Sequence, residues 1–242
     1  MSDPLANLLL AALPGEDLAR LTPHLERLTL ASRYPVYDAG GPIPHVYFPV
    51  DCVISLVSEM DGGRLVEVAT VGREGVVGLP VFWGAGSMPL RAFAQIPGDA
   101  YRMPADAFRA ATAAGGDLPA LLLRYTQAVF HQVARSAACN RVHPVDRRCA
   151  RWLLMSHDRV GRDRFELTQV FLGQMLGVRR SGVGEAAGAL QRAGLIRYTR
   201  GRITVVDRAG LEAAACECYR VIRDEHQRVA GGTGVPVDES ST

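Results

Sequence analysis

Arginines and small polar residues follow an apolar repeat in residues 168–192, TQVFLGQMLGVRRSGVGEAAGALQR, and they are the groups in this chain best placed to do chemistry. Arg179, Arg180 and Ser181 can donate hydrogen bonds to the base edges and phosphates of DNA, which is the chemistry that their grouping indicates. The other residues that we expect to contact DNA are Thr168, Gln169, Glu185, Arg200 and Arg202.

Two short helices crossed at a tight turn must position these side chains. Gly173 and Gly177 lie four residues apart, and glycines let two backbones approach closely and tolerate the positive φ of a turn. The residues expected to face inward are Leu172, Leu176, Val178, Val183 and Ala186. This spacing predicts a helix-turn-helix, whose second helix meets the major groove at its start. The alternative is an ordinary amphipathic helical hairpin.

A basic hairpin is expected directly after this segment. Residues 195–206, LIRYTRGRITVV, hold two short β-prone runs joined through Gly201, with arginines at positions 197, 200 and 202. Two such runs around a glycine are typical of a hairpin. A basic hairpin beside a basic helix is hard to explain as core, which favours a winged DNA-binding unit.

The charge of the chain is segregated along its length. Residues 141–208 carry 14 Arg against 6 acidic residues (+8), whereas residues 1–140 carry 10 against 13 (−3) and residues 209–242 carry 3 against 6 (−3). All 27 basic residues are Arg, so the choice of Arg over Lys carries no argument. The positive charge lies on the expected DNA-binding unit, as nucleic-acid binding requires.

Composition limits the class of protein. With 242 residues and 48% hydrophobic content, the chain is long enough for two modest domains. No apolar run approaches the about 18 residues of a membrane helix, and the start, MSDPLANLLLAALPGED, lacks the basic segment of a signal peptide. The odd number of cysteines, five, does not form a disulfide framework, so we expect a cytoplasmic protein without membrane contact.

Short strands dominate the first hundred residues. The clearest are 46–48, 52–57, 65–71, 91–96 and 100–103, with a hairpin turn at Asp61-Gly62-Gly63. Short helices are expected at 4–13, 16–24 and 104–114. The pattern predicts a small β-barrel or jelly roll and an α+β fold.

The longest expected helix covers residues 118–139. Leu122, Val129, Val133 and Ser136 lie along one stripe of this helix, while Tyr125 lies on the adjoining face, so more than one side needs burial. We expect Leu122, Tyr125, Val129 and Val133 to form a dimer interface, because a helix-turn-helix protein usually reads two half-sites as a dimer. The alternative is a helix buried within its own domain.

The order of these parts, with Asn140-Arg141-Val142-His143-Pro144 and an expected helix at 145–155, resembles the Crp/Fnr family of bacterial transcription regulators. The resemblance implies an N-terminal β-roll sensor domain (1–117), a dimerisation helix (118–140), a winged helix-turn-helix domain (141–229) and a flexible tail (230–242). It also implies a homodimer that binds palindromic double-stranded DNA, with RNA polymerase as a further candidate partner.

Three positions that read bases in the family fall on Arg180, Ser181 and Glu185, where well-known members have Arg, Glu and Arg. Only Arg180 is kept, and an arginine there can bind guanine through two hydrogen bonds. Glu185 could accept a hydrogen bond from cytosine. The resemblance therefore implies an operator that differs from the one those members recognise.

The family's nucleotide-binding cassette corresponds to residues 72–95. Gly75 and Gly78 fit its glycines and Arg91 fits its phosphate-binding arginine, but Val76 and Ala92 replace a carboxylate and a hydroxyl. Loss of these polar partners disfavours cyclic AMP and cyclic GMP as effectors. A cyclic-nucleotide-responsive regulator stays as an alternative.

We expect no cofactor, no metal and no catalytic residues. The first cysteine, Cys52, lies too far along the chain for the family's N-terminal iron–sulfur cluster, and His24 and His45 are expected to be structural rather than haem ligands. Cys216 and Cys218, two apart on an expected helix, should point to different faces. The chain has no closely spaced His pair, G-x-S-x-G or G-x-x-x-x-G-K motif, so an enzyme is disfavoured. The remaining alternative is a ligand-binding β-roll that regulates a protein partner.

Overall fold

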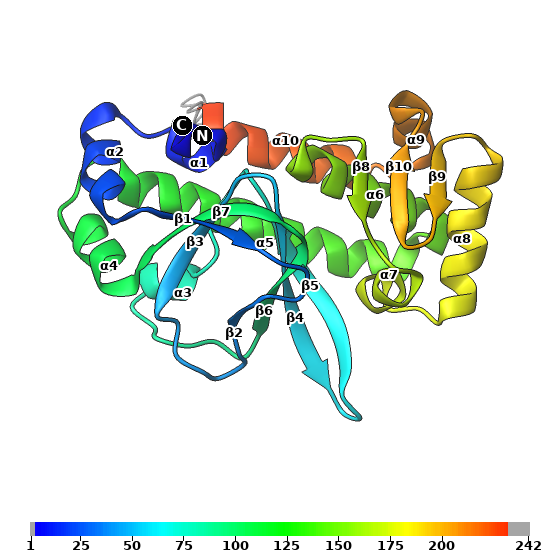
Figure 1. The fold of residues 1–242 in the computed structure, drawn as a ribbon, viewed down its shortest axis with the longest axis horizontal. Coiled ribbons are helices and arrows are strands. Elements are labelled where there is room, and N and C mark those ends of the chain that lie inside the picture. The colour runs from blue at the N-terminus through cyan, green and yellow to red at the C-terminus, as the bar shows by residue number, and fades with distance from the viewer. Residues whose placement is uncertain (1–2, 232–242) are drawn as a thin grey trace, which may run out of the picture.

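Two antiparallel sheets form the N-terminal half of the molecule in the computed structural model, which describes residues 3–231 (Figure 1). One sheet has the strand order β1-β7-β3 and the other β2-β6-β4-β5. The strands are β1 (Glu26–Leu30), β2 (Pro35–Tyr37), β3 (His45–Pro49), β4 (Val53–Met60), β5 (Arg64–Val71), β6 (Arg91–Ile96) and β7 (Gly98–Pro104). Side chains from both sheets form one apolar core. The expected β-roll is thus confirmed.

The hairpin between β4 and β5 turns at the predicted glycines. Gly62 and Gly63 have φ values of +77° and +71°, a conformation that glycine adopts without steric cost. Two expected strands, β4 and β5, begin within one residue of their predicted positions, and β6 has the predicted bounds. Strands β1 and β2 were not expected from the sequence.

Short helices lie at one end of the roll (Figure 1). They are the 3-10 helices η1 (Pro4–Ala6) and η2 (Thr22–His24) and the α-helices α1 (Leu8–Ala11), α2 (Gly15–Leu21), α3 (Leu79–Phe82) and α4 (Ala105–Ala113). The helix expected over 4–13 is divided at Asn7, whose side chain accepts hydrogen bonds from the backbone of Leu9 and Leu10. Asn7 also donates to the carbonyls of Pro49 and Gly75, which fixes the N-terminus to the roll.

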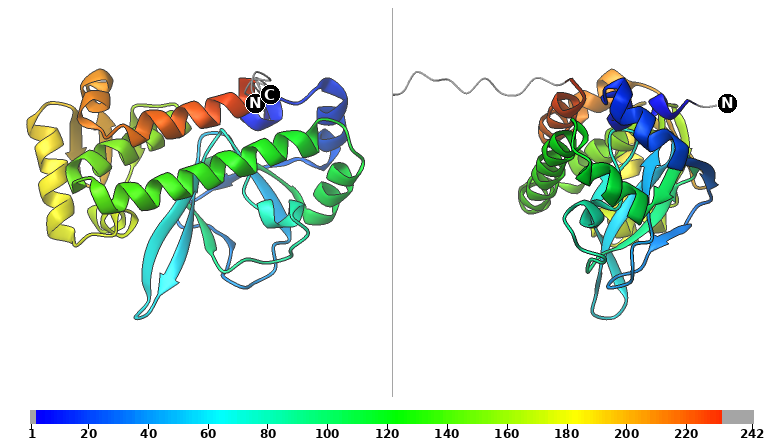
Figure 2. Two further views of the ribbon diagram at one scale, coloured as in Figure 1. Left: turned by 180° about the vertical axis from the view of Figure 1, so that it is seen from behind. Right: turned by 90° about the vertical axis from the view of Figure 1, so that its left-hand side faces the viewer.

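The long helix α5 (Leu118–Val142) runs along the roll and on toward the C-terminal half. Its N-terminal half supplies buried side chains to the core of the roll. The last helix, α10 (Cys218–Gly231), lies beside α5 (Figure 2). Because α10 continues through Gly231, the first two residues of the expected tail are helical; residues 232–242 of that tail lie outside the described part of the chain.

The C-terminal half contains α6 (Val145–Val160), β8 (Arg164–Glu166), α7 (Gln169–Leu176), α8 (Arg180–Arg192), β9 (Ile196–Thr199), β10 (Arg202–Val205), α9 (Arg208–Ala214) and α10. Its strands form a small sheet with the order β8-β10-β9. Helix α6 ends at Gly161, which has a φ of +63°. The α+β fold with a winged helix-turn-helix is therefore confirmed, with β8 as an unexpected third strand.

Contacts between the roll and the C-terminal half are both apolar and polar. Phe93 of β6 packs edge-on against Phe171 of α7, with 5.7 Å between the ring centroids. A buried ion pair joins Glu74 to Arg159 of α6 at 2.7 Å. In the arrangement described here, the helix-turn-helix is docked on the roll.

Candidate nucleic-acid interface

The turn between α7 and α8 has the geometry that its glycines predict. Gly177 ends α7 with a φ of +65°. A Cβ added at Gly173 would lie 3.1 Å from the carbonyl oxygen of Val178 and 3.2 Å from Val183 Cγ2. Only a residue without a side chain fits this approach comfortably. Thr168 caps α7, because its Oγ1 accepts a hydrogen bond from the backbone N–H of Phe171 at 3.2 Å.

Helix α8 buries one face and exposes the other. Val183 and Ala186 are buried in the core of the C-terminal half, as expected, and Leu190 is buried beside them. Among the predicted DNA-binding residues, Arg179, Ser181 and Glu185 are exposed. Arg180 is the first residue of α8, and its side chain lies outside the part of the chain that the structure describes.

The start of α8 is suited to an anion. Its N-cap residue, Arg179, makes no side-chain capping hydrogen bond, so the first N–H groups of the helix point outward without that partner. Together with the helix dipole and an exposed arginine, such N–H groups favour a phosphate.

The wing is a tight hairpin with arginine at its tip. Arg200 and Gly201 have φ values of +49° and +75°, which is the pair of positive φ angles of a type I′ turn. Both Arg200 and Arg202 are exposed. Arg202 lies 3.5 Å from Glu166, and a pair this exposed contributes little to stability and can be exchanged for a phosphate contact.

A groove of about 510 Å³ joins the wing to α8. Thr168, Gln169 and Arg200 line it together with Gly184 and Gly188 of α8. The structure thus brings these three predicted residues together. Because the two glycines carry no side chain, the backbone of α8 is open to close approach at these two positions.

The five predicted effector-binding residues are not all brought together. Val76 and Gly78 line a cavity of about 320 Å³ between the roll and α5. Gly75 lies against Tyr125, so closely that a Cβ there would overlap the phenol ring. Arg91 is instead 3.3 Å from the exposed Asp38, and Ala92 is fully buried in β6; neither lines the cavity.

The lining of this cavity is apolar. It includes Leu56, Val71, Leu79, Met88 and Val133, and no charged residue lines it within the described chain. A phosphodiester placed here would lose its hydration without gaining a cationic partner, which is costly. The cavity therefore suits an apolar group rather than a cyclic nucleotide.

Two of the four predicted dimer residues are corrected by the structure. Leu122 and Tyr125 are fully buried in the core of their own chain, so they have no surface left for a partner. Val129 and Val133 are half-buried and line the apolar cavity. Leu122 and Tyr125 were misassigned because the roll covers them within their own chain.

The exposed face of α5 is a different one. Leu123 and Phe130 are 61% and 68% exposed, and with Gln127, Ala134 and Ala137 they lie on one side of the helix at spacings of three and four residues. The apolar residues at 123 and 130 indicate in the sequence that this face needs a partner. Which face of α5 packs on the roll and which stays exposed, however, could be decided only from the structure.

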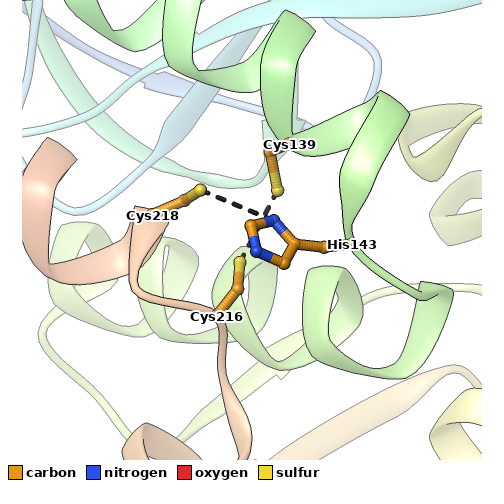
Figure 3. Close-up of side chains that lie close together, drawn as sticks. All are labelled: Cys139, His143, Cys216 and Cys218. Carbon is orange, nitrogen blue, oxygen red and sulfur yellow. Dashed lines mark hydrogen bonds between the residues drawn. The ribbon is translucent and has the colours of Figure 1, made fainter.

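The expectation that Cys216 and Cys218 point to different faces of a helix is wrong. Cys216 precedes α10 and Cys218 is its first residue, and both thiols face Cys139 and His143 (Figure 3). Sequence reasoning missed this group because its two halves lie far apart in the chain: Cys216 comes 77 positions after Cys139.

Comparison with known proteins agrees with this geometry. A family model of the Crp-like helix-turn-helix domain matches residues 147–214. No curated protein matches the chain. Among the described residues, no helix is both long and apolar enough to cross a membrane.

Solved structures are similar over most of the chain. FixK2 from Bradyrhizobium japonicum is 18% identical with a TM-score of 0.67, covering 79% of this chain and 98% of that one. A CRP-family transcriptional regulator from Thermus thermophilus is 19% identical with a TM-score of 0.64, covering 78% and 96%. The c-di-GMP-responsive regulator CLP from Xanthomonas campestris is 17% identical with a TM-score of 0.59, covering 79% and 99%. The chain thus contains a Crp-like helix-turn-helix domain and has the fold of the Crp/Fnr transcription regulators.

Proposed function

We propose that the protein is a transcription regulator of the Crp/Fnr type, which binds a palindromic DNA operator as a homodimer under the control of a signal received by the roll. The observation that carries this proposal is the exposed start of α8 beside the arginine-tipped wing, with the opposite face of α8 buried. Exposed arginines on a structured helix and hairpin have no role in the core, whereas they match the shape and charge of a DNA groove.

The proposed DNA contacts fall into two groups, those to bases and those to phosphates. Arg180, Ser181 and Glu185 lie in the first turns of α8, where base edges are reached. Thr168 and Gln169 at the start of α7, Arg179, and the wing residues Arg200 and Arg202 are assigned to the phosphate backbone. Base contacts then set the operator sequence, and phosphate contacts set much of the affinity.

The proposed dimer interface is the exposed face of α5 around Leu123 and Phe130. Large apolar side chains more than half exposed on one helix face indicate a missing partner. A second copy supplies the matching face, since a two-fold dimer uses the same patch on both chains. The pairing of the two chains would place two copies of α8 on successive turns of the operator.

The sensor part, residues 1–117, is proposed to act through α5. Phe130 and Val133 line the apolar cavity of the roll, and Phe130 also belongs to the proposed interface. A ligand-induced rearrangement of the cavity would therefore act directly on the partner chain. It would act on the DNA-binding part, residues 141–229, through the segment that follows α5. We place this activity in the cytoplasm, with RNA polymerase as the candidate protein partner at promoters.

Selection of bound duplexes from a random DNA library by the full-length chain tests the proposal. We expect enrichment of an inverted repeat whose half-sites lie one helical turn apart, about 10 base pairs. Failure to enrich any sequence, with binding to a protein partner instead, would support the alternative of a β-roll that regulates a protein.

A further inference from the structure

Four potential metal ligands meet where α5 ends and α10 begins. Cys139 lies in the last turns of α5 and His143 follows its last residue, while Cys216 lies in the connection between α9 and α10 and Cys218 is the first residue of α10. One ligand atom from each residue lies within 4.8 Å of all the others (Figure 3). The three cysteines are buried and His143 is half-buried.

We propose that Cys139, His143, Cys216 and Cys218 form a mononuclear zinc site. Three cysteines and one histidine are an established ligand set for structural zinc. Tetrahedral zinc with bonds to sulfur of about 2.3 Å holds its sulfurs about 3.8 Å apart. Here Cys139 Sγ lies 3.5 Å from Cys216 Sγ, and Cys218 Sγ lies 3.7 Å from His143 Nδ1.

The compactness of the group favours a single ion. An iron–sulfur cluster places several irons and bridging sulfides between its cysteines, so it needs a wider arrangement. A tetrahedral ion needs only small adjustments of these four side chains. Zinc binding displaces the three thiol protons to solvent and fills all four positions with protein ligands, which is the pattern of a structural rather than a catalytic site.

The histidine already has the outer partner that a zinc ligand requires. Glu217 lies between the two cysteines in sequence, and its Oε2 is 3.2 Å from His143 Nε2. This contact leaves His143 Nδ1 turned toward Cys218. A carboxylate that accepts the second N–H of a ligating histidine fixes the orientation of the ring and strengthens the ligand.

Charge supports the same conclusion. Zinc with three thiolates and a neutral histidine carries a net charge of −1. Arg148 and Arg151 of α6 are buried, and each interacts electrostatically with cysteines of the group. Arg151 also interacts with the carboxyl group of Glu67, whereas within residues 3–231 the groups that act on Arg148 include no carboxylate. Buried charges are normally paired, and the loaded site supplies a negative partner for Arg148.

The proposed zinc site lies where it would link α5 to α10. Cys139 lies in the last turns of α5 and His143 follows its end, while Cys216 precedes and Cys218 begins α10, the helix that packs along α5. Zinc would therefore hold the start of α10 to the C-terminal end of α5 and to His143, where the chain passes into α6. We expect the zinc-loaded chain to unfold at a higher temperature than the metal-free chain.

Cobalt(II) titration of the reduced, metal-free, full-length chain tests the proposal. We expect one equivalent of cobalt to give the thiolate charge-transfer and intense visible bands of a tetrahedral site, and zinc to displace it. Zinc should also be present at about one ion per chain after purification without chelators. Binding that requires no cysteine, or octahedral cobalt bands alone, would contradict the assignment.

Variants identify the ligands. Cys218→Ser should weaken zinc binding more than 10-fold in competition with a chromophoric chelator, and Glu217→Gln should weaken it about 10-fold to 100-fold. Cys149→Ala is the matched control, because Cys149 is a buried cysteine of α6 outside the group, and it should bind as wild type. The wild-type titration does not depend on how the variants fold. A reduced wild-type chain that binds no zinc, or that only forms a Cys139–Cys216 disulfide on oxidation, would overturn the proposal.

Discussion

Arg180 is the residue on which operator choice is proposed to depend most. It occupies the first position of α8, and an arginine there can bind guanine through two hydrogen bonds worth about 1 to 3 kcal/mol. We predict that Arg180→Ala lowers affinity for the selected operator by about 10-fold to 100-fold and leaves weak binding to random DNA. Fluorescence anisotropy with both duplexes measures the two affinities.

Wing variants and a surface control separate base reading from phosphate binding. Arg200→Ala or Arg202→Ala should weaken operator and random DNA alike and reduce the salt slope by about 1. Arg220→Ala changes an exposed arginine of α10, away from the groove, and should have no effect. An equal loss of specific and random binding in Arg180→Ala would show that Arg180 is not a base reader.

Glu67 links the roll to α6 and is sensitive to pH. Its carboxylate accepts hydrogen bonds from Trp152 Nε1 and Ser55 Oγ, each at 2.8 Å. Burial raises the pKa of Glu67 from 4.5 to about 7, although these hydrogen bonds act against the shift. The folded state therefore binds the proton of Glu67 more tightly than the unfolded state does. The contribution of the protonated Glu67 to the free energy of unfolding is complete below pH 4.5 and is lost as pH rises through 7.

Glu67→Gln removes this titration and keeps an acceptor for Trp152. We predict that the variant gains stability over wild type as pH rises from 5 to 8, by an amount on the order of 2 kcal/mol. Urea unfolding across this range measures the difference. His226, whose pKa is lowered by burial to about 4, is common to both chains and cancels in the comparison. A difference that does not change with pH would contradict the shift.

At the residue scale, sequence predicted best where function and local geometry coincide. The roles of Gly173 and Gly177 were predictable because each depends on local geometry alone. Gly173 allows a close approach of two backbones, and Gly177 adopts a positive φ. The grouping of Cys139 with Cys216 was not predictable, because it depends on the path of the chain between α9 and α10.

The cavity between the roll and α5 is the place where we propose that the roll receives its signal, and its lining limits which effectors fit there. Its lining joins strand residues such as Leu56 and Val71 to Val129 and Val133 of α5. Burial of a charged phosphate among such side chains is unfavourable without a cationic partner. The arginine that the resemblance offers, Arg91, lies outside this lining and near Asp38.

We predict that cyclic AMP has no specific effect on this protein. Isothermal titration calorimetry at physiological salt should show no saturable binding in the micromolar range, and operator affinity should be unchanged by the nucleotide. A ligand at about 100 times its dissociation constant would add about 2.7 kcal/mol to the folded state, so thermal unfolding provides an independent check. Tight binding would mean that the cavity reorganises to admit a charged ligand.

Elements with strong local signals were predicted, and those fixed by long-range pairing were not. The β4–β5 hairpin has two glycines at its turn, and β6 is a continuous run of mainly apolar residues. By contrast, β1 (ERLTL) exposes Glu26 and Arg27 and is held by pairing with β7, which is distant in sequence. The short strand β8 likewise depends on β10. Sequence alone contains no comparable signal for such pairings.

At the scale of the whole molecule, the proposed dimer depends on the exposed face of α5. We predict that Phe130→Arg gives a folded monomer with at least 10-fold weaker operator binding, because it places two like charges at a two-fold interface. Light scattering measures the molar mass. Val221→Arg alters an apolar residue of α10 that is also exposed and should leave the dimer intact. A dimeric Phe130→Arg chain would show that the interface lies elsewhere.

Contacts between the roll and the C-terminal half are the route by which the proposed signal would reach α8. Phe93 and Phe171, Glu67 and Trp152, and Glu74 and Arg159 all join the roll to the DNA-binding part. Any movement of the recognition helices relative to the roll must break or exchange these contacts.

The central claim is that two copies of this chain read one DNA site in sequence-specific fashion. Its most direct test is to titrate the selected operator and a scrambled duplex with the full-length chain at one fixed salt concentration, with the mass of the complex measured by light scattering. The account predicts two chains per operator and an affinity at least about 1,000-fold above that for the scrambled duplex. Equal affinity for both duplexes, or one chain per operator at saturation, would contradict it.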